Sequence, residues 1–489
     1  MLDRFTNTNT LEKQQKLLGC LPKVEDTQTA WLLLLYCAAA RANYTTRVVA
    51  PRFCEEYSQA HDAAVFDCLC CLLGVPADAV AEEWRTVAGL PFSMGGLGLR
   101  CAERLSVAAH WASWADCLAM VKARHPDIAQ EWVTKLERGG EGDEALTQVT
   151  ASEGLLRGMG ADLPTWQELA DGQRPAPVRE QEPGVFQRGW QRVASKPLDE
   201  SARENVVTQL TRKEQAHLRS QSGPGAGAVF AAVPTCADLR IAPQPFRVLL
   251  LRRFRLPLPP TSRFCRCRLF LDPQGDHRAA CPKAGVLGRR GFPLEAAAAR
   301  VCREAGGRVR TNAFVRDMNI GAPRPDDGRR LEVLVNNLPL YNGAQLAVDT
   351  TLVCALRSNG DARPRADTVD GLALRDARRA KERVYPELCG SRARTHLVVF
   401  ALEVGGRWSS EAINFVRLLA RARARSEPPL LRKSAEAAWQ RRWTGLLAVA
   451  AQRAFAESLL EWHGQAGSDS FALPSTQAVL EDARHVSGE

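Results

Sequence analysis

The sequence predicts a multidomain protein with an α-helical N-terminal region, a small metal-binding segment and a C-terminal α/β domain. Three observations lead to this prediction. The chain has 489 residues, which is too many for one hydrophobic core. Apolar residues recur at helical spacing through the first 135 residues, whereas the clearest strand-like runs come after residue 330. Between these regions, three cysteines and one histidine follow one another at close spacing.

The first predicted region, residues 1–135, is helical. Apolar side chains recur at helical spacing around 31–36 and 65–73. A glycine-rich stretch at 89–99 interrupts the pattern, which returns from 102 to 120. The three cysteines of the second helix have no matching pair or histidine at ligand spacing, so we expect them to pack in the core.

Residues 136–240 are predicted to form a linker and a helical connector. The stretch from about 139 to 184 is rich in Gly, Glu, Pro and Gln, which is typical of a linker or of loosely packed helices. Further helices are expected around 199–219. The glycines at 223–227 resemble a phosphate-binding loop only in composition, and we interpret them as a turn.

Residues 241–285 begin with a strongly basic segment. Between residues 246 and 270 there are seven arginines and no acidic residue, interleaved with apolar and aromatic side chains. This combination suits phosphate contact and base stacking, although a helix with a solvated basic face is the alternative. The arginines expected to contact nucleic acid are Arg247, Arg252, Arg253 and Arg255, with Arg378 and Arg379 of a later helix.

The same segment holds four possible metal ligands, Cys265, Cys267, His277 and Cys281. Their spacing is C-x-C-x9-H-x3-C, and residues 272–275 offer a turn that would bring the two halves together. Such ligands suit tetrahedral zinc. The first pair is tighter than the usual C-x2-C, and the alternative is three unrelated thiols with a surface histidine. The prediction is a structural zinc site.

Residues 286–465 alternate helices and strands, which predicts an α/β domain, and 466–489 are expected to be a flexible tail. An Asn-Gly pair at 342–343 indicates a hairpin between the first two strands. The expected elements are a helix at 293–305, strands at 330–337 and 346–353, a basic helix at 371–385, a strand buried on both faces at 396–404, and helices at 409–424 and 439–459.

Each strand of this hairpin carries one acidic residue among aliphatic neighbours, Glu332 and Asp349. A buried carboxylate is costly unless it is paired or binds a metal, and two on adjacent strands could share a divalent cation. Glu295 from the preceding helix and Lys381 from the following one would complete a site for phosphodiester hydrolysis. There, Mg²⁺ or Mn²⁺ would activate water, and the lysine would position it or offset charge on the phosphate.

Each of these residues also has a structural alternative. Glu332 could pair with a neighbouring arginine at the sheet edge, and Asp349 could be a capping or salt-bridged acid. Glu295 could be an exposed helix acid, and Lys381 one more member of a basic face. Glu403, in the last buried strand, is a further candidate for the site.

The overall composition limits which cellular compartment and which binding partners can be expected. A net charge of +10 suits an anionic partner such as nucleic acid, or simple solubility. The 15 cysteines are an odd number scattered over a long chain, which favours a reducing compartment. The N-terminus lacks the apolar core of a signal peptide, and the most apolar run is too short for a bilayer. We therefore expect a soluble nuclear or cytoplasmic protein that is neither secreted nor membrane-bound.

The segment from about 246 to 460 resembles the C-terminal part of non-LTR retrotransposon polyproteins that carry a restriction-like endonuclease of the PD-(D/E)xK type. Those proteins place a Cys/His zinc knuckle shortly before the nuclease, as the Cys/His segment here precedes Glu332 and Asp349. Lys381 and Tyr385 resemble the family's lysine and tyrosine on a downstream helix. Residues 1 to about 120 resemble the stretch that follows the reverse-transcriptase palm.

The resemblance implies a metal-dependent endonuclease that nicks target DNA, with the element's RNA as a possible second partner. Leu331-Glu332 stands where the family has Pro-Asp, and Thr351 where it has a lysine. No Tyr-x-Asp-Asp polymerase signature is present, so no polymerase activity is expected. The alternatives are a catalytically dead remnant that binds nucleic acid through its zinc knuckle and arginines, and a protein-interaction remnant of the helical region.

Overall fold

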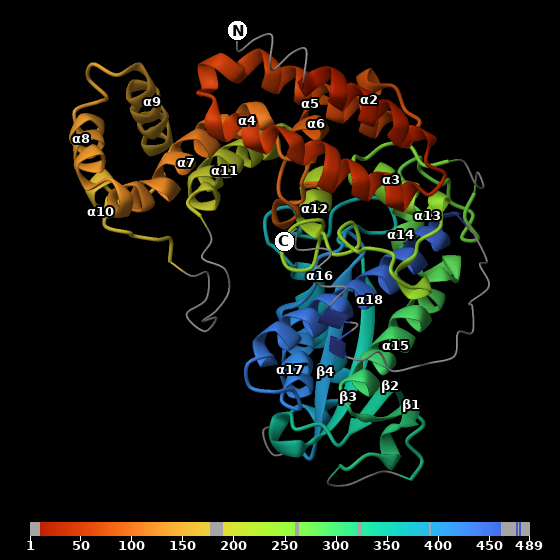
Figure 1. Cartoon of the computed structure of the whole chain (residues 1–489). Helices are drawn as coiled ribbons and strands as arrows, with labels where there is room; N and C mark the ends of the chain where they lie inside the picture. Colours follow the sequence, from red (N-terminus) through yellow and green to blue (C-terminus); the bar gives the residue numbers. More distant parts are fainter. Residues whose placement is uncertain are drawn as a thin grey trace. The chain divides into compact units, whose positions relative to one another are not determined.

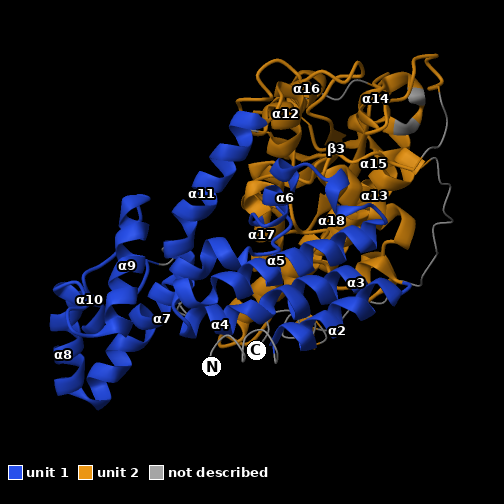
Figure 2. Cartoon of the chain, turned by 90° about the horizontal axis from the view of Figure 1, so that it is seen from above, with its two compact units in different colours: residues 1–25, 30–91, 96–209 blue, residues 26–29, 92–95, 210–489 orange. Residues whose placement is uncertain are grey.

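The computed structural model describes residues 10–176, 189–259, 264–320, 325–390, 393–460, 476–477 and 479–480. The chain divides into two compact units, coloured in Figure 2. Unit 1 comprises residues 1–25, 30–91 and 96–209, and unit 2 comprises 26–29, 92–95 and 210–489. The main boundary therefore falls between residues 209 and 210, inside the predicted connector, rather than at residue 135 or 240. The predicted tail lies almost entirely outside the described residues.

Unit 1 is helical throughout its described part and is organised around one long helix, α7 (Ala102–Arg124). This helix contacts α4, α5, α8, α9, α10 and α11. The fully buried ring of Trp111 lies 6.1 Å from Trp166 and 6.2 Å from Trp190, centroid to centroid. The helix predicted at 102–120 is thereby confirmed. The other helices are α2 (Glu12–Cys20), α3 (Thr27–Leu33, which begins in unit 2), α4 (Ala42–Val48), α5 (Pro51–Leu73), α6 (Glu82–Ala88), α8 (Pro126–Glu137), α9 (Glu144–Gly158), α10 (Trp166–Ala170) and α11 (Gln191–Gln209).

Two features of unit 1 test the predictions further. The stretch expected to be a linker or loosely packed helices contains α9 and α10, and Val149 and Leu156 are fully buried in the core around α7. The glycine and glutamate content of this stretch therefore did not indicate that these helices pack in the core. The break at 89–99 is real, because a side chain on Gly96 would lie 1.9 Å from the carbonyl oxygen of Leu90. Of the three neighbouring cysteines in α5 that were expected to pack in the core, Cys68 and Cys70 are buried and Cys71 is exposed.

Unit 2 contains one four-stranded sheet with helices packed on it (Figure 1). Its strands are β1 (Arg308–Phe314), β2 (Arg330–Asn336), β3 (Gln345–Val353) and β4 (Thr395–Glu403), in that spatial order. The first three are antiparallel neighbours, and β4 is parallel to β3. Its helices are α12 (Arg212–Ser220), α13 (Pro243–Arg253), α14 (Asp276–Ala280), α15 (Val286–Glu304), α16 (Leu372–Val384), α17 (Ser410–Ala424) and α18 (Arg432–Leu460).

The helices cover the sheet in a way that places α15 and α16 next to the acidic strands. Helix α15 packs on β1, β2 and β3, and α16 packs on β3 and β4. Helix α17 packs on β4 and on α18, which also contacts α15. All residues of β4 except His396 are buried, which confirms the strand predicted to be buried on both faces.

The edge strand β1 was not predicted. Its exposed residues include Arg308, Arg310, Thr311 and Asn312, and only Ala313 is buried, so it lacks an apolar pattern. Asn312 also has a left-handed backbone, with φ of 53°. The pairing of β1 with β2 skips this residue and keeps the same register on both sides of it, so the ladder is interrupted at Asn312.

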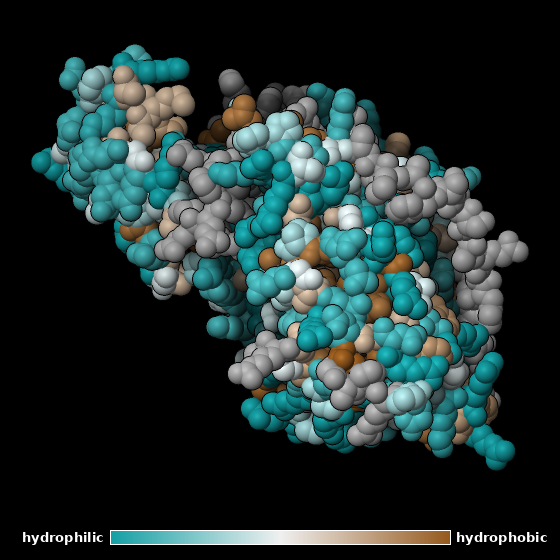
Figure 3. Space-filling model, turned by 90° about the horizontal axis from the view of Figure 1, so that it is seen from below, coloured by the Kyte–Doolittle hydropathy of each residue, from teal (hydrophilic) through white to brown (hydrophobic). Residues whose placement is uncertain are grey.

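Hydrophilic side chains cover most of the face in Figure 3, with hydrophobic ones in small groups among them. No described helix combines the length and the low polarity that a bilayer-spanning segment needs. Among the exposed large hydrophobic residues of the chain, three fall within one stretch of seven: Phe264, Leu269 and Phe270.

Candidate metal centres

The four predicted zinc ligands come together in unit 2. Their ligand atoms all lie within 4.8 Å of one another. The Sγ atoms of Cys265 and Cys281 are 3.9 Å apart, and Cys267 Sγ lies 3.2 Å from His277 Nε2. Tetrahedral zinc with thiolate ligands requires sulfur atoms about 3.8 Å apart. The Cys3His group can therefore hold a metal such as zinc.

A tight hairpin accounts for the short C-x-C spacing. The backbone N–H of Arg268 donates to the carbonyl oxygen of Cys265 at 2.8 Å, and the N–H of Cys265 donates to that of Leu269 at 2.9 Å. Arg268 has a left-handed backbone that closes the turn, with φ of 72°. This turn, closed between residues 265 and 268, lets the thiols of Cys265 and Cys267 reach the same group of ligand atoms.

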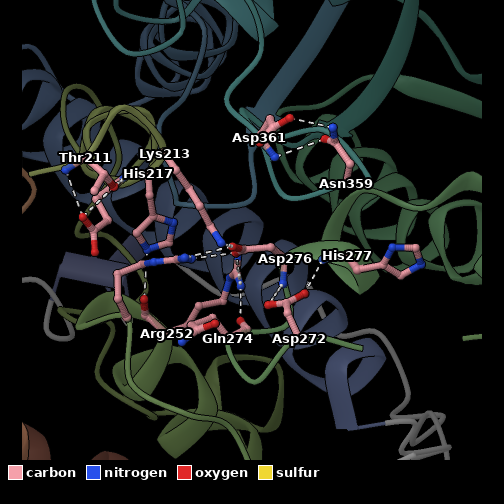
Figure 4. A network of polar contacts seen from close by, with 12 residues as sticks. Thr211, Lys213, His217, Arg252, Asp272, Gln274, Asp276, His277, Asn359 and Asp361 are labelled. Carbon is pink, nitrogen blue, oxygen red and sulfur yellow. Dashed lines mark hydrogen bonds and ion pairs between the residues drawn. The ribbon is translucent and has the colours of Figure 1, made fainter. Parts of the chain in front are cut away.

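The second half of the metal group is placed by a capped helix. The carboxylate of Asp272 accepts hydrogen bonds from the backbone N–H groups of Asp276, at 2.9 Å, and His277, at 2.7 Å (Figure 4). Gly275 opens α14 with a positive φ of 74°, where a side chain would be strained. The turn predicted at 272–275 is thus present, and it directs His277 and Cys281 toward the hairpin.

Contacts from distant segments hold this module in place. The Nδ1 atom of His277 lies 2.6 Å from the carbonyl oxygen of Ser358. This contact fixes the orientation of the ring and leaves Nε2, which faces the thiols, available as a metal ligand. Figure 4 shows Lys213 and Arg252 reaching toward the neighbouring Asp276, which has no exposed surface. Burial alone would raise the pKa of Asp276, but Arg255, Arg252 and Lys213 outweigh it and hold that pKa well below the usual range.

These contacts correct the prediction for three of the arginines. Arg255 pairs with both carboxylate oxygens of Asp276, at 2.6 and 2.9 Å, and Arg252 Nη1 lies 3.2 Å from the same carboxylate. Arg253 is 2% exposed, and burial lowers its pKa to about 9. It donates hydrogen bonds to the carbonyl oxygens of Gln221, Ala226 and Gly405.

Arg252, Arg253 and Arg255 therefore bind the protein interior and are not available to a phosphate. The local sequence misled because the groups that neutralise these arginines lie up to about 150 residues away. Arg247 is half-buried. This part of the basic segment is therefore a structural core element, whereas Arg266 and Arg268 further along the segment are exposed.

The two predicted acidic residues lie side by side on the central strands. The antiparallel register of β2 and β3 ends with Val333 opposite Val348, and one further step places Glu332 opposite Asp349. Directly opposed residues of antiparallel strands point to the same face. Lys381 from α16 reaches this face, with its Nζ 2.7 Å from Asp349 Oδ1.

Glu332 sits where the sheet is least regular. The hydrogen-bonded ladder to β3 stops just before it, and on its other side the opposed residue is Asn312, the left-handed residue that drops out of the ladder with β1. Irregular strand geometry at such a point frees space around a side chain. No sequence signal indicated Asn312, although asparagine is among the residues that tolerate this backbone.

Burial and mutual repulsion shape the charge of this cluster. Asp349 is 1% exposed, and Glu332 is half-buried. Burial, followed by the charge of Asp349, raises the pKa of Glu332 to about 7. Burial raises the pKa of Asp349 against the opposing effect of Lys381. Burial and then Asp349 also raise the pKa of Glu295, so the three carboxylates and the lysine share one electrostatic environment.

Two carboxylate oxygens of the cluster are buried without a hydrogen bond from any described residue, Glu332 Oε2 and Asp349 Oδ2. Buried polar atoms normally have a partner, and a bound cation would supply one here. The acidic cluster is nevertheless looser than the Cys3His group. The ligand atoms of Glu295, Glu332 and Asp349 do not all lie within 4.8 Å of one another.

Several structural alternatives can be judged from contacts. Arg329 pairs with Asp327 and Glu387, each at 2.6 Å, and Arg330 lies over the Phe314 ring, so Glu332 does not pair with either arginine. The hydroxyl of Tyr385 donates to the carbonyl oxygen of Arg330 at 2.9 Å, which anchors the end of α16 to β2.

Glu403 lies away from the acidic cluster. Its register partner on β3 is Val353, four residues and about 13 Å beyond Asp349. Its surroundings are instead Ser220, Arg407 and Asp370, and burial raises its pKa to about 7.

Helix α16 presents a row of exposed arginines on a different face from Lys381. Arg375, Arg379 and Arg383 are four residues apart and all exposed, so they share one face of the helix. Arg378 instead pairs with Glu411 at 3.0 Å and with Glu382 at 3.6 Å. Of the two arginines predicted in this helix to contact nucleic acid, Arg379 is the exposed one.

One further group of potential ligands lies in unit 1, where Asp62, Cys101 and Glu103 come within 4.8 Å of one another. Asp62 accepts hydrogen bonds from the backbone N–H groups of Ala102 and Glu103 and from the thiol of Cys101. Its carboxylate is therefore already used to cap α7, which explains this cluster without a metal.

The assignment of both centres in unit 2 rests on their own residues. The Cys3His group is compact and supported by contacts outside it, and the acidic cluster is buried, repulsive and partly neutralised by Lys381. No protein-family model matches this chain, and no curated protein matches it.

Proposed function

We propose that this chain is part of a non-LTR retrotransposon polyprotein and acts as a metal-dependent DNA endonuclease. The observation that carries the proposal is the opposed pair Glu332 and Asp349 with Lys381 at 2.7 Å from Asp349. Two desolvated acids on neighbouring central strands destabilise a fold unless a cation compensates their charge, and perturbed carboxylates with a nearby cation are typical of catalytic sites.

The fold supports this reading. Helix α15, three antiparallel strands, helix α16 and a parallel fourth strand follow one another along the chain. The acids lie on β2 and β3, and the lysine comes from the helix after β3. This agrees with the α/β nuclease domain that the resemblance implies, and a Cys/His segment precedes it in the chain.

The chemistry that the residues support is phosphodiester hydrolysis. Glu332 and Asp349 would hold Mg²⁺ or Mn²⁺, and Glu295 would complete their set of oxygens. The bound ion supplies a water of lowered pKa and polarises the phosphate. Lys381 then takes the position that the missing lysine at Thr351 would have had. Its ammonium group, held by Asp349, can orient the attacking water or offset charge on the phosphate oxygens.

The surface around the cluster suits DNA as the substrate. The exposed row of Arg375, Arg379 and Arg383 lies on the same helix as Lys381 and offers phosphate contacts on the outer face of that helix. Zinc in the Cys3His group would be structural, since four protein ligands leave no open position. DNA is therefore the proposed partner, with the element's RNA as a second one and the nucleus as the place of action.

A nicking assay with the full chain tests the proposal. We expect supercoiled plasmid to be nicked in the presence of Mg²⁺ or Mn²⁺, and Asp349→Asn to reduce the rate at least about a hundredfold. Asp376→Asn, an exposed acid on α16, is the matched control and should leave the rate unchanged. Zinc content and circular dichroism identify a misfolded variant. Nicking that survives Asp349→Asn, or its absence in a folded protein with divalent metal, would refute the nuclease.

The second candidate function is nucleic-acid binding without catalysis. It is favoured by one observation, which is that Lys381 already neutralises Asp349 and the three carboxylates are not drawn together. In that case the chain binds plasmid DNA with a steep dependence on salt but does not cleave it with any divalent ion.

A further inference from the structure

An arginine links the last turn of α16, which carries Lys381, to strand β2. Arg329 directly precedes β2 and reaches the end of the helix, where its Nη1 donates a hydrogen bond to the carbonyl oxygen of Val384. The backbone N–H of Tyr385 donates to the carbonyl oxygen of Lys381 at 2.9 Å, so Lys381 and Val384 belong to the same final turn. A contact that fixes Val384 therefore also fixes the backbone from which Lys381 extends.

The guanidinium of Arg329 binds three groups at once. Besides the helix-terminal carbonyl, its Nη2 lies 2.6 Å from both Asp327 and Glu387, and its Nε lies 3.0 Å from both carboxylate oxygens of Asp327. The planar fork of arginine allows one side chain to join two carboxylates and a carbonyl. Its positive charge also suits the negative end of the helix dipole. We refer to Asp327, Arg329 and Glu387 as the arginine clamp.

The arginine clamp connects the two sides of the acidic cluster. Helix α16 packs on β3 and β4, whereas Glu332 lies on β2, shortly after Arg329. Tyr385 adds a second link to β2, since its hydroxyl donates to the carbonyl oxygen of Arg330 at 2.9 Å. The Arg329 guanidinium also lies over the Tyr385 ring, 5.7 Å from its centroid. These contacts set the position of Lys381 relative to Glu332.

The other end of α16 is anchored without the clamp. Asp370, which precedes the helix, pairs with Arg219 of α12 at 2.8 Å and with Arg407 at 3.2 Å. Loss of the clamp would therefore leave the helix attached to the fold while its last turn becomes free to shift. The side chain of Lys381 is 27% exposed, so burial alone does not fix its position.

We propose that Arg329 is a positioning residue, which holds Lys381 in place beside the acid pair through its contacts with Val384 and Glu387. This inference rests on the proposed function for the chemistry of the site. It adds a residue whose side chain binds the end of the helix rather than the acids. A shift of about 1 Å in a catalytic group can cost about a hundredfold in rate, so a contact outside the site can control the reaction.

The first test measures Lys381 itself and needs neither metal nor DNA. The full chain is treated briefly with succinimidyl acetate, which acetylates free amines, and the modified lysines are quantified by mass spectrometry. We expect Lys381 to react more slowly than the exposed Lys13 in the wild type, because Asp349 holds its ammonium group. Arg329→Gln should accelerate acetylation of Lys381 at least about threefold and leave Lys13 unchanged, because only the last turn of α16 loosens.

The second test measures nicking of plasmid with Mg²⁺. Arg329→Gln should reduce kcat at least about tenfold and change KM less than about twofold, because the contacts with DNA are retained. In the background of Lys381→Met it should cause no further loss, since a residue that acts through Lys381 then has nothing to position. A general loss of stability would instead reduce kcat equally in both backgrounds.

Two variants separate the clamp from charge and from general destabilisation. Arg329→Lys keeps the charge at the helix end but cannot join both carboxylates to Val384, so it should not restore the wild-type values. Arg442→Gln is the matched control. It removes the ion pair with buried Glu304, on a helix that packs on α13, α15 and α17, and should leave acetylation of Lys381 unchanged.

The outcomes are distinct. Unchanged acetylation of Lys381 in Arg329→Gln, or an equal increase in Arg442→Gln, overturns the positioning role. Full recovery with Arg329→Lys, or losses of kcat that multiply in the Lys381→Met background, overturns it as well. Acetylation of Lys381 that depends on the clamp in a chain that never nicks plasmid supports the clamp and refutes only the nuclease.

A second variant keeps the proposal testable if Arg329→Gln loses its zinc or unfolds. Glu387→Gln removes one carboxylate of the clamp and leaves Arg329 bound to Asp327. It should raise the acetylation rate of Lys381 about twofold, because the last turn of α16 is then less firmly held. No increase in a folded Glu387→Gln variant would overturn the proposal.

Discussion

The Cys3His group and the acidic cluster of unit 2 differ in how the chain assembles them. All four members of the Cys3His group come from 17 residues, and a hairpin and a capped helix bring them within 4.8 Å. The acidic cluster draws Glu295, Glu332, Asp349 and Lys381 from four different elements and leaves the carboxylates further apart. Soft ligands on a short loop form a site by local structure, whereas hard ligands on separate strands depend on the whole sheet.

The energetic roles of the two centres are opposite as well. A metal in the Cys3His group would add stability to a segment with little core of its own. The acidic cluster stores repulsion, because Glu332 and Asp349 are both desolvated and only Lys381 compensates. In the proposed function the Cys3His group serves folding and the acidic cluster serves chemistry, and the following predictions test this contrast in order of expected effect.

The largest effect is expected for Cys281→Ser. Loss of this buried ligand should reduce bound zinc from about one per chain to near zero and destabilise unit 2 by more than about 5 kcal/mol. Atomic emission and thermal unfolding measure these changes. Cys389→Ser, an exposed thiol outside the group, should alter neither. An unchanged zinc content would show that the Cys3His group is not a metal site.

The next largest effect is expected for Lys381→Met. It leaves Asp349 buried and unpaired, which should lower the free energy of unfolding by about 3 kcal/mol at pH 8, a modest value because the lysine is 27% exposed. The loss should shrink as the pH falls, since a protonated Asp349 carries no charge. Added Mg²⁺ should stabilise this variant more than the wild type, and Lys381→Arg is the control. A loss of stability that does not vary with pH would contradict the presence of a buried, ionised Asp349.

A gain in stability is expected for Glu332→Gln in Mg²⁺-free buffer. The pKa of Glu332 rises from its ordinary 4.5 to about 7, so the wild type loses stability as the pH rises between these values. The variant should be more stable by about 2 kcal/mol at pH 8, with no difference below about pH 4. Chemical denaturation at several pH values measures it. Equal stability at pH 8 would show that the acid pair is not strained.

The smallest effect is expected for Arg379→Ala on the exposed row of α16. Affinity for duplex DNA should fall a few-fold. The slope of log affinity against log salt concentration should become shallower by about one, because about one fewer counterion is released. Arg138→Ala, an exposed arginine of unit 1, is the matched control. If the salt dependence is unchanged, α16 does not contact DNA. The proposed binding of DNA near the acidic cluster would then lack its arginine contacts.

The same contrast explains how much the sequence could predict. The Cys3His ligands and the turn at 272–275 follow from spacing alone, because local geometry decides them. The pairing of β2 with β3 followed from two apolar runs and a turn signal. Strand β1 was not predicted, because its side chains are mostly exposed and give no apolar pattern. Helices α9 and α10 were not identified as packed helices, because the glycine and glutamate content of this stretch hid the pattern of their buried residues.

The arginines of α13, and Arg255 just after it, show where prediction from sequence must fail. Their density in an acid-free stretch indicated a phosphate-binding surface, yet Arg253 donates to carbonyl oxygens of residues 221, 226 and 405, and Arg255 to Asp276. Whether a cation faces solvent or a buried carbonyl depends on partners that only the tertiary fold brings near. Likewise, no pattern could place Asn312 opposite Glu332.

The irregular edge strand β1 has a consequence for how the protein behaves at high concentration. Its outer rim offers arginines and a left-handed asparagine in place of a straight row of free amide and carbonyl groups. A strand from another molecule cannot dock in register along such a rim. The edge of the sheet at β1 is thus protected against strand-to-strand aggregation. The protection comes from the same irregularity at Asn312 that interrupts the ladder beside Glu332.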